Sequence, residues 1–254
     1  MRCNRHVAAR RGFIPPYLRY QQRTPGEHVE NRPYKGFLLA IEGPDGAGKS
    51  TLRTWLSQWF GGHGINAVLT REPGGTPEAE VLRERILMDR EPGLHEELPP
   101  LAKTLMFMAA RALHLENMIW PRLKNGELII TDRFCDSTFA YQSEEGMNPH
   151  KLKAMHLEAF DGYQPDLTII LDGNPLVFRE RMVARAAEYQ ENYYDRKPLS
   201  FHENTRATYL ACAAAEPFRY LVVDAEQSFE QVQAQLIPML MKIDAHLRKR
   251  PETA

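Results

Sequence analysis

Short apolar runs alternate with amphipathic stretches along most of the chain, from about residue 36 onward. The apolar runs cover residues 37–41, 67–70, 128–130, 167–171 and 220–223. Because they are apolar at odd and even positions alike, these runs predict strands buried on both faces of a parallel sheet. Between them, apolar residues recur at helical spacing, for example over 101–120 and 229–247.

Alternating strands and helices of this kind predict a doubly wound α/β fold with a parallel five-stranded sheet. The strand at 37–41 is expected to be central and paired on both edges. In such sheets the ligand binds beyond the carboxyl ends of the strands. Most of the apolar runs lead within two residues into a charged residue or a glycine turn at that edge. Residues 35–254 are therefore predicted to form one domain with its site there.

The predicted helix over 101–120 carries a regular apolar stripe. Its members are Leu101, Leu105, Met108, Ala112, Leu115 and Ile119. This spacing predicts that the stripe faces the core. Phe107 and Arg111 lie off the stripe and one turn apart, so they are predicted to share another face. An aromatic ring beside a basic side chain is suited to binding a flat polar ring.

Composition excludes several classes of protein. A formal net charge of -1 argues against a general nucleic-acid binder. No apolar run approaches the roughly 18 residues that a membrane helix needs. The three cysteines are far apart and show no CxxC pairing. We therefore expect no disulfide framework and no zinc site, and a reducing, cytoplasmic location.

Residues 1–34 differ from the rest of the chain, since several arginines precede the first acid, Glu27. Prolines in this stretch break any helix. We expect a flexible basic arm that holds no site residue and can be removed without loss of activity. An arginine-rich, acid-free composition is also half of a mitochondrial transit signature, but the first serine is Ser50. A targeting role is the less favoured alternative.

A glycine-rich motif follows the first predicted strand and opens a helix. It fits G-x-x-x-x-G-K-[ST] and consists of Gly43, Pro44, Asp45, Gly46, Ala47, Gly48, Lys49 and Ser50, with Thr51 after it. Backbone N–H groups of such a loop, together with the N-terminal end of the helix, surround phosphate oxygens. Lys49 is predicted to reach the β and γ phosphates of ATP or GTP, and Ser50 to ligate Mg²⁺.

Two further observations narrow the kind of P-loop protein. The chain has no Asn-Lys-x-Asp segment of the kind that GTPases use to recognise guanine. A motor or AAA-type ATPase would carry Asp-Glu after a hydrophobic strand, where this chain has Asp132-Arg133. A basic residue at this place suits the phosphate of a second ligand, which favours a small-molecule kinase.

From about Phe37 to Leu247 the chain resembles the thymidylate kinase family, bacterial type. The resemblance rests on the P-loop and on the motifs Thr-Arg-Glu-Pro-Gly-Gly-Thr at 70–76, Phe-Met-Ala-Ala-Arg at 107–111 and Asp-Arg-Phe-Cys-Asp-Ser-Thr-Phe-Ala-Tyr-Gln at 132–142. It implies phosphorylation of dTMP to dTDP with ATP and Mg²⁺, in dTTP synthesis. It also implies a homodimer.

The resemblance assigns the acceptor's base and sugar to particular side chains. Phe107 would stack on the thymine, and Arg111 would donate to its O4, where cytosine carries an amino donor. Asp45 would accept a hydrogen bond from the sugar 3′-hydroxyl. Tyr141 would pack against the deoxyribose and leave no room for a 2′-hydroxyl, with Ser137 and Thr138 on the same wall. Gln142 is also assigned to the substrate-binding set.

The phosphate groups are assigned in the same way. Arg71 and Arg133 would hold the phosphate of the acceptor, because a guanidinium group can make paired hydrogen bonds to phosphate. Asp132 would reach the Mg²⁺ shell. A structural salt bridge is the alternative role for either arginine.

Residues 179–200 are predicted to form a lid. Some members of the family place an arginine inside the P-loop, but this chain has Gly46 there, so the positive charge at the transferring phosphoryl group should come from the lid. Arg185 and Arg196 are the candidates, and the predicted catalytic set is completed by Lys49, Arg133 and Asp45. Asp195-Arg196 resembles the Asp-Arg of the family's lid, although the glutamate that usually follows is absent.

Two other functions stay open at this point. A broader deoxynucleoside monophosphate kinase of the same fold would accept other monophosphates. A P-loop ATPase module, which belongs to a different class, would hydrolyse ATP without an acceptor and without a response to monophosphates.

Overall fold

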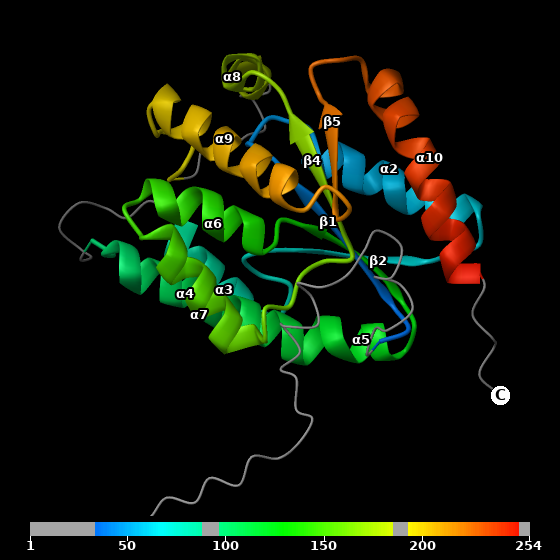
Figure 1. Cartoon of the computed structure of the whole chain (residues 1–254), viewed down its shortest axis with the longest axis horizontal. Coiled ribbons are helices and arrows are strands. Elements are labelled where there is room, and N and C mark those ends of the chain that lie inside the picture. The colour runs from blue at the N-terminus through cyan, green and yellow to red at the C-terminus, as the bar shows by residue number, and fades with distance from the viewer. Residues whose placement is uncertain (1–33, 88–96, 185–192, 249–254) are drawn as a thin grey trace, which may run out of the picture.

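The computed structural model describes residues 34–87, 97–184 and 193–248. Within them, five parallel strands form one sheet in the order β2-β3-β1-β4-β5 (Figure 1). The strands are β1 (Phe37–Glu42), β2 (Ala67–Arg71), β3 (Leu128–Asp132), β4 (Leu167–Asp172) and β5 (Tyr220–Asp224). Each predicted strand is present and extends slightly further at its carboxyl end, and the predicted α/β fold is confirmed.

β1 lies at the centre of the sheet and pairs with β3 and β4, as predicted. All of its residues are buried, because helices cover both of its faces. The two edge strands differ, since Leu69 of β2 is 39% exposed and Val222 of β5 is 42% exposed. The prediction of burial on both faces is wrong for β2 and β5, because each has one neighbouring strand and lies at the margin of the helical layers.

Helices cover both faces of the sheet (Figure 1). On one face, α2 (Lys49–Gly62) and α10 (Phe229–Arg248) pack against the odd-numbered side chains of β1. The even-numbered side chains face the other layer, as the period of a strand requires. That layer contains α4 (Pro100–His114), η1 (Leu115–Ile119), α5 (Trp120–Lys124), α6 (Cys135–Glu144) and α7 (Pro149–Phe160). The remaining helices are α3 (Pro77–Leu87), α8 (Pro175–Ala184) and α9 (Leu199–Ala215).

The helix predicted over 101–120 is longer and less regular than expected. It continues from α4 through the π turn η1 into α5. The π turn ends at Ile119, two residues before Pro121, which has no N–H to donate to the carbonyl of residue 117. A π turn at this point widens the helix and accommodates the missing hydrogen bond.

The apolar stripe of this helix faces the core only in its second half. Met108, Leu115 and Ile119 are buried, whereas Leu101 is 42% and Leu105 51% exposed. The prediction is therefore wrong for the first two members. Most of the buried residues of α4 are polar, because its charged side chains find buried partners. They include Lys103, Thr104, Arg111 and His114, beside the apolar Met108 and Ala110.

No helix within the described ranges combines the length and the apolar character that crossing a bilayer requires.

His156 of α7 is a buried titratable group away from the carboxyl edge of the sheet. Its ring packs 5.6 Å from that of Phe139 and 5.3 Å from that of Phe160. Nε2 donates a hydrogen bond to the carbonyl of Tyr163 at 2.8 Å. Burial, helped by the charge of Arg111, lowers the pKa of His156 to about 4. The neutral imidazole is thus the form that the fold accepts.

We predict that His156 makes the free energy of unfolding fall as the pH drops from about 6.5 toward 4. In that window the unfolded chain binds a proton that the folded chain does not, which costs on the order of 3 kcal/mol. Urea denaturation of the wild type and of His156→Gln at pH 7 and pH 4.5 checks this. The stability difference between the two proteins should shrink at the lower pH, and a constant difference would contradict it.

Candidate active site

The P-loop lies between β1 and α2, at the carboxyl edge of the sheet. Lys49 is only 6% exposed and its Nζ donates to the carbonyls of Gly43 (3.0 Å) and Pro44 (2.8 Å). It also lies 3.3 Å from Oδ1 of Asp45. The lysine is therefore folded back over its own loop, where a phosphate would offer stronger acceptors.

Gly46 is in contact with α8. Its φ is 81°, and a Cβ atom built on it would lie 2.3 Å from the carbonyl oxygen of Phe178 and 2.8 Å from Cγ of Met182. The loop therefore has room for no side chain at this position. The close contact with α8 therefore explains sterically why this chain has glycine and not arginine at position 46 of the P-loop.

A pocket opens in front of the P-loop. Its lining is formed by Asp45, Gly46, Gly48, Lys49, Ser50, Thr51, Asp132, Arg181 and Met182. Within the described residues, Oδ1 of Asp132 is buried and has no hydrogen-bond partner. A hydroxyl group and a carboxylate oxygen in one phosphate-sized pocket fit a Mg²⁺ ion, which prefers oxygen ligands and keeps several waters.

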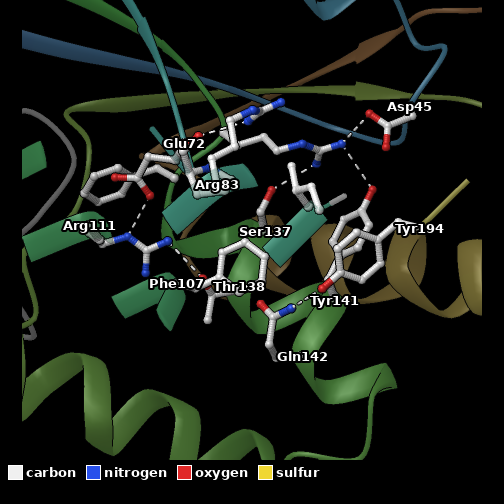
Figure 2. A pocket seen from close by; sticks show the side chains of 14 residues that line it. Asp45, Glu72, Arg83, Phe107, Arg111, Ser137, Thr138, Tyr141, Gln142 and Tyr194 are labelled. Atoms are coloured by element: carbon white, nitrogen blue, oxygen red, sulfur yellow. Dashed lines mark hydrogen bonds and ion pairs between the residues drawn. The ribbon is translucent and has the colours of Figure 1, made fainter. Parts of the chain in front are cut away.

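A second pocket, with about 540 Å³ of empty space, lies beside the first (Figure 2). It is lined by Asp45, Glu72, Pro73, Arg83, Leu87, Phe107, Arg111, Arg133, Phe134, Ser137, Thr138, Tyr141, Gln142 and Tyr194. Asp45 belongs to both pockets. Two ligands bound in them would therefore meet at this residue.

Arg133 lines the second pocket and reaches Asp45, which belongs to both pockets. Its Nη2 lies 2.7 Å from Oδ1 of Asp45 and donates to the hydroxyl of Tyr141 at 3.2 Å. Burial alone would raise the pKa of Asp45, but Arg133 and Lys49 together hold it well below its usual range. One carboxylate thus separates two cations, and it stays ionised.

The backbone at Arg133 is held in an uncommon conformation. Its φ is 69°, and its N–H donates to the carbonyl of Ile41 at 2.9 Å. The following turn is fixed by Glu42, whose Oε1 accepts hydrogen bonds from the N–H groups of Phe134 (2.7 Å) and Ser137 (3.1 Å). A positive φ in a residue other than glycine persists where neighbouring contacts enforce it.

Glu42 also supports the guanidinium group of Arg133 through two hydroxyls. Its Oε2 accepts from Ser137 Oγ at 2.6 Å and from Tyr209 OH at 3.0 Å. Nη1 of Arg133 donates to the same two hydroxyl oxygens, at 3.0 Å and 3.2 Å. The side chain of Arg133 is therefore positioned on both sides, by Asp45 and by this buried network.

Arg111 lies at the far side of the second pocket and is 2% exposed. Its Nε pairs with Glu72 Oε2 at 2.8 Å, and its Nη2 donates to Thr138 Oγ1 at 2.9 Å. His114 Nδ1 lies 3.2 Å from the other oxygen of Glu72. Burial alone would raise the pKa of Glu72, but these two partners lower it.

The third nitrogen of Arg111 differs from the other two. Among the described residues, Nη1 is buried and has no hydrogen-bond partner. A buried donor without a partner costs free energy unless a ligand supplies an acceptor. Arg111 and Phe107 both line this pocket. The pocket therefore offers an aromatic ring together with an unmatched N–H.

The structure brings most of the sequence-predicted residues together. Phe107, Arg111 and Arg133 line the second pocket with Ser137, Thr138, Tyr141 and Gln142. Arg71 is not part of its lining; it lies at the end of β2, largely exposed, and pairs with Glu80 at 2.8 Å. Arg196 is exposed and lines neither pocket, and Arg185 lies outside the described residues.

Three polar residues of the second pocket's lining had no role assigned from the sequence. Glu72 stands inside the motif at 70–76, but nothing in the motif shows that its partner would be Arg111. Arg83 of α3 donates from Nη1 to the carbonyl of Pro73 at 2.9 Å. On an amphipathic helix such an arginine is typical of a solvated face. Tyr194 belongs to the segment predicted to be a lid. No pattern in the neighbouring sequence predicts that its side chain would line this pocket.

Known proteins with similar sequences point to one family. A family profile described as Thymidylate kinase matches residues 41–236. The thymidylate kinase of Chromohalobacter salexigens is 39% identical over 216 residues, which cover 85% of this chain and 96% of that protein. Those of Cereibacter sphaeroides and Pseudomonas syringae pv. tomato are 40% and 38% identical over 204 and 209 residues, covering 79% and 82% of this chain and 92% and 96% of the relatives.

We predict that Gly46→Ala lowers the free energy of unfolding by on the order of 2 kcal/mol, because a positive φ and the carbonyl of Phe178 both oppose a methyl group. Gly61→Ala is the matched control, since a Cβ atom there meets nothing within 4 Å. This second change should be neutral or stabilising by up to about 1 kcal/mol, since glycine is a poor helix former. Chemical denaturation of both variants decides, and equal effects would refute the steric account.

Proposed function

The chain belongs to the thymidylate kinase family and phosphorylates dTMP with ATP, and we propose that the two pockets meeting at Asp45 bind the two nucleotides of this transfer. The observation that carries the assignment is the unpartnered Nη1 of Arg111 in the pocket that Phe107 also lines. ATP would place its phosphates against the P-loop, and dTMP would occupy the second pocket.

The base of the acceptor would lie on Phe107 with its O4 atom at Nη1 of Arg111. Thymine and uracil both present an acceptor at this position, whereas cytosine presents an amino donor. Because Glu72 and Thr138 already hold the other two nitrogens of the guanidinium group, Arg111 cannot turn away to avoid that clash. The deoxyribose would then pack against Tyr141.

The phosphate of the acceptor would be bound by Arg133 and Arg83, which both line the second pocket. Arg71 would join them after leaving Glu80. On binding the phosphate, Arg133 would give up its ion pair with Asp45. The carboxylate of Asp45 would then be available to accept a hydrogen bond from the sugar 3′-hydroxyl. Charge-assisted contacts of this kind are roughly twice as strong as neutral hydrogen bonds.

Asp132 and Ser50 would hold Mg²⁺ on the side of the donor nucleotide. When bound, the ion would neutralise charge on the phosphate oxygens of ATP. The nucleophile is a phosphate oxygen of dTMP, which is already largely ionised at neutral pH because the second pKa of a phosphomonoester is about 6. No general base is required. The chain's own contribution is to orient the two phosphates and to stabilise their charge with Lys49 and Arg133.

The lid arginines stay predictions. Arg196 would have to approach the phosphates from an exposed position, and Arg185 lies outside the described residues. A cytoplasmic location also stays a prediction, as does the division into an arm at 1–34 and a domain at 35–254.

A coupled assay of ADP release against a panel of nucleoside monophosphates tests the proposal. We expect dTMP to be the preferred acceptor, with dUMP next and dCMP poor. Broad acceptance would indicate a general deoxynucleoside monophosphate kinase. ATP hydrolysis that no monophosphate changes would indicate an ATPase module.

We predict that Arg111→Ala weakens the binding of dTMP by on the order of 2 kcal/mol, which corresponds to a KM about thirtyfold higher, because a buried charged donor to the base is lost. The KM for ATP should stay close to the wild-type value. Steady-state kinetics with each substrate varied in turn measure both, and a melting curve shows whether the variant is folded. An unchanged KM for dTMP in a folded variant would remove the role in base recognition.

We predict that Arg83→Ala raises the KM for dTMP by about tenfold, since a charged hydrogen bond to phosphate is worth about 1.5–3 kcal/mol. Arg71→Ala should have a smaller effect, because this side chain is exposed and already paired. Comparing the two variants in one assay ranks the arginines. A larger effect for Arg71→Ala would show that Arg71 is the main phosphate ligand.

We also propose that the chain forms a homodimer through α3 and α4. These helices pack side by side, and they expose Val81 (61%), Leu101 (42%) and Leu105 (51%). Large apolar side chains gathered on one surface are typical of a protein interface. A dimer would also explain why the first half of the apolar stripe on α4 faces away from the core.

We predict that light scattering gives a mass of about twice 29.2 kDa for the wild type and close to 29.2 kDa for Leu105→Glu. A charge in the centre of an apolar contact is costly to bury. As a control, Ile237→Glu changes an apolar residue on α10 that is 42% exposed and should leave the mass unchanged. A monomeric wild type at micromolar concentration would refute the dimer.

A further inference from the structure

The side-chain amide of Gln142 is held by two groups that lie outside the family motifs of the sequence. Nε2 of Gln142 donates to the hydroxyl of Tyr194 at 2.9 Å and to Oε2 of Glu145 at 3.2 Å. Tyr194 also donates its own hydroxyl hydrogen to Glu145 Oε2 at 3.0 Å. Gln142, Glu145 and Tyr194 thus form a closed set of three hydrogen bonds.

The charge state of Glu145 fixes the direction of these bonds. Its Oε1 pairs with Nζ of Lys103 at 2.6 Å, and both side chains are at most 7% exposed. An ionised carboxylate can only accept hydrogen bonds. Tyr194 must therefore donate to Glu145, and burial beside that carboxylate raises the pKa of Tyr194 well above its ordinary value, so the hydrogen stays on the hydroxyl.

The orientation of the Gln142 amide follows from this arrangement. The single hydrogen of the Tyr194 hydroxyl is used by Glu145, so toward Gln142 the hydroxyl can only accept. Both neighbours of the amide are then acceptors, and the amide must turn its NH₂ group to them. Its oxygen, Oε1, is left on the opposite side, and in Figure 2 it points away from Tyr194 toward the ring of Phe107. No described residue donates to it.

We propose that Tyr194, Glu145 and Lys103 are positioning residues that lock Gln142 with its oxygen toward the base, so that Oε1 accepts a hydrogen bond from N3–H of thymine or uracil. This inference rests on the proposed function, because it takes the second pocket as the site of the pyrimidine. Cytosine has an unprotonated N3 at this position, which is an acceptor and would face the oxygen of Gln142. The lock therefore adds a second point of discrimination to that of Arg111.

Without the lock, Gln142 would discriminate poorly. Rotation of a glutamine side chain by 180° about its Cγ–Cδ bond exchanges the amide oxygen, an acceptor, for the NH₂ group, a donor. The two groups have nearly the same shape, so packing alone does not select between them. A freely turning amide would offer its NH₂ group to the N3 atom of cytosine. The residues that hold the amide of Gln142 would thus help to decide which base is accepted.

The test compares Tyr194→Phe and Glu145→Gln with the wild-type enzyme, by kcat/KM for dTMP and for dCMP. Tyr194→Phe keeps the ring and removes only the hydroxyl, so the dTMP to dCMP ratio should fall about three- to tenfold, as for one lost hydrogen bond. In Glu145→Gln the new amide can donate as well as accept, so the ratio should fall further. The KM for ATP should not change.

Tyr193→Phe is the matched control. Tyr193 is the neighbouring residue, and its hydroxyl accepts from Lys197 Nζ at 2.7 Å. This variant should keep the wild-type ratio. Glu145→Gln could unfold because Lys103 loses its counter-charge, and a melting curve would show this. In that case the dTMP to dCMP ratio of Tyr194→Phe alone tests the lock.

The outcomes separate this inference from the proposed function. An unchanged dTMP to dCMP ratio in folded Tyr194→Phe, in an enzyme that phosphorylates dTMP, would overturn the lock and leave the proposed function standing. Equal loss for both substrates would reduce Tyr194 to a structural role and overturn the lock as well. A wild-type enzyme without activity on dTMP would overturn both.

Discussion

The carboxylate of Asp45 lies between two cations, and the arrangement of both pockets depends on it. Lys49 and Arg133 both reach its Oδ1, one from the P-loop and one from the turn after β3. Two cations that share one carboxylate oxygen in a largely buried site would otherwise repel each other strongly. The carboxylate offsets that repulsion before any phosphate has bound. It therefore keeps the donor side and the acceptor side of the site assembled next to each other.

Much of this site could be predicted because its signals are local. A strand, a glycine-rich turn and a helix follow one another within residues 37–62, and Arg133 follows the next strand of the sheet in the same way. The residues that were missed act across long sequence separations. Glu72 meets Arg111, and Tyr194 meets Gln142, from elements whose packing no local pattern reveals. The apolar period on α4 failed for another reason: periodicity identifies an apolar face, but it does not tell whether that face lies in the core or at the surface.

The second pocket is built on buried charges rather than on apolar packing alone. Arg111 is neutralised by Glu72, and Lys103 by Glu145, so each buried cation of α4 has its own carboxylate. Such pairs recover the cost of desolvation only when their geometry is well satisfied. The same requirement makes them stiff. A stiff frame lets the pocket present donors and acceptors in fixed positions, which a flexible set of polar side chains would not do.

The contact between Gly46 and the carbonyl of Phe178 has a consequence for how this chain can diverge. A side chain at position 46 is excluded as long as α8 begins where it does. Placing an arginine at position 46 of the P-loop would thus take at least two steps, a shift of α8 and then the substitution. If the substitution came first, the new side chain would clash with the carbonyl of Phe178 and destabilise the fold. The two regions are expected to covary, so that lineages with an arginine in the P-loop also carry a rearranged start of the helix that follows β4.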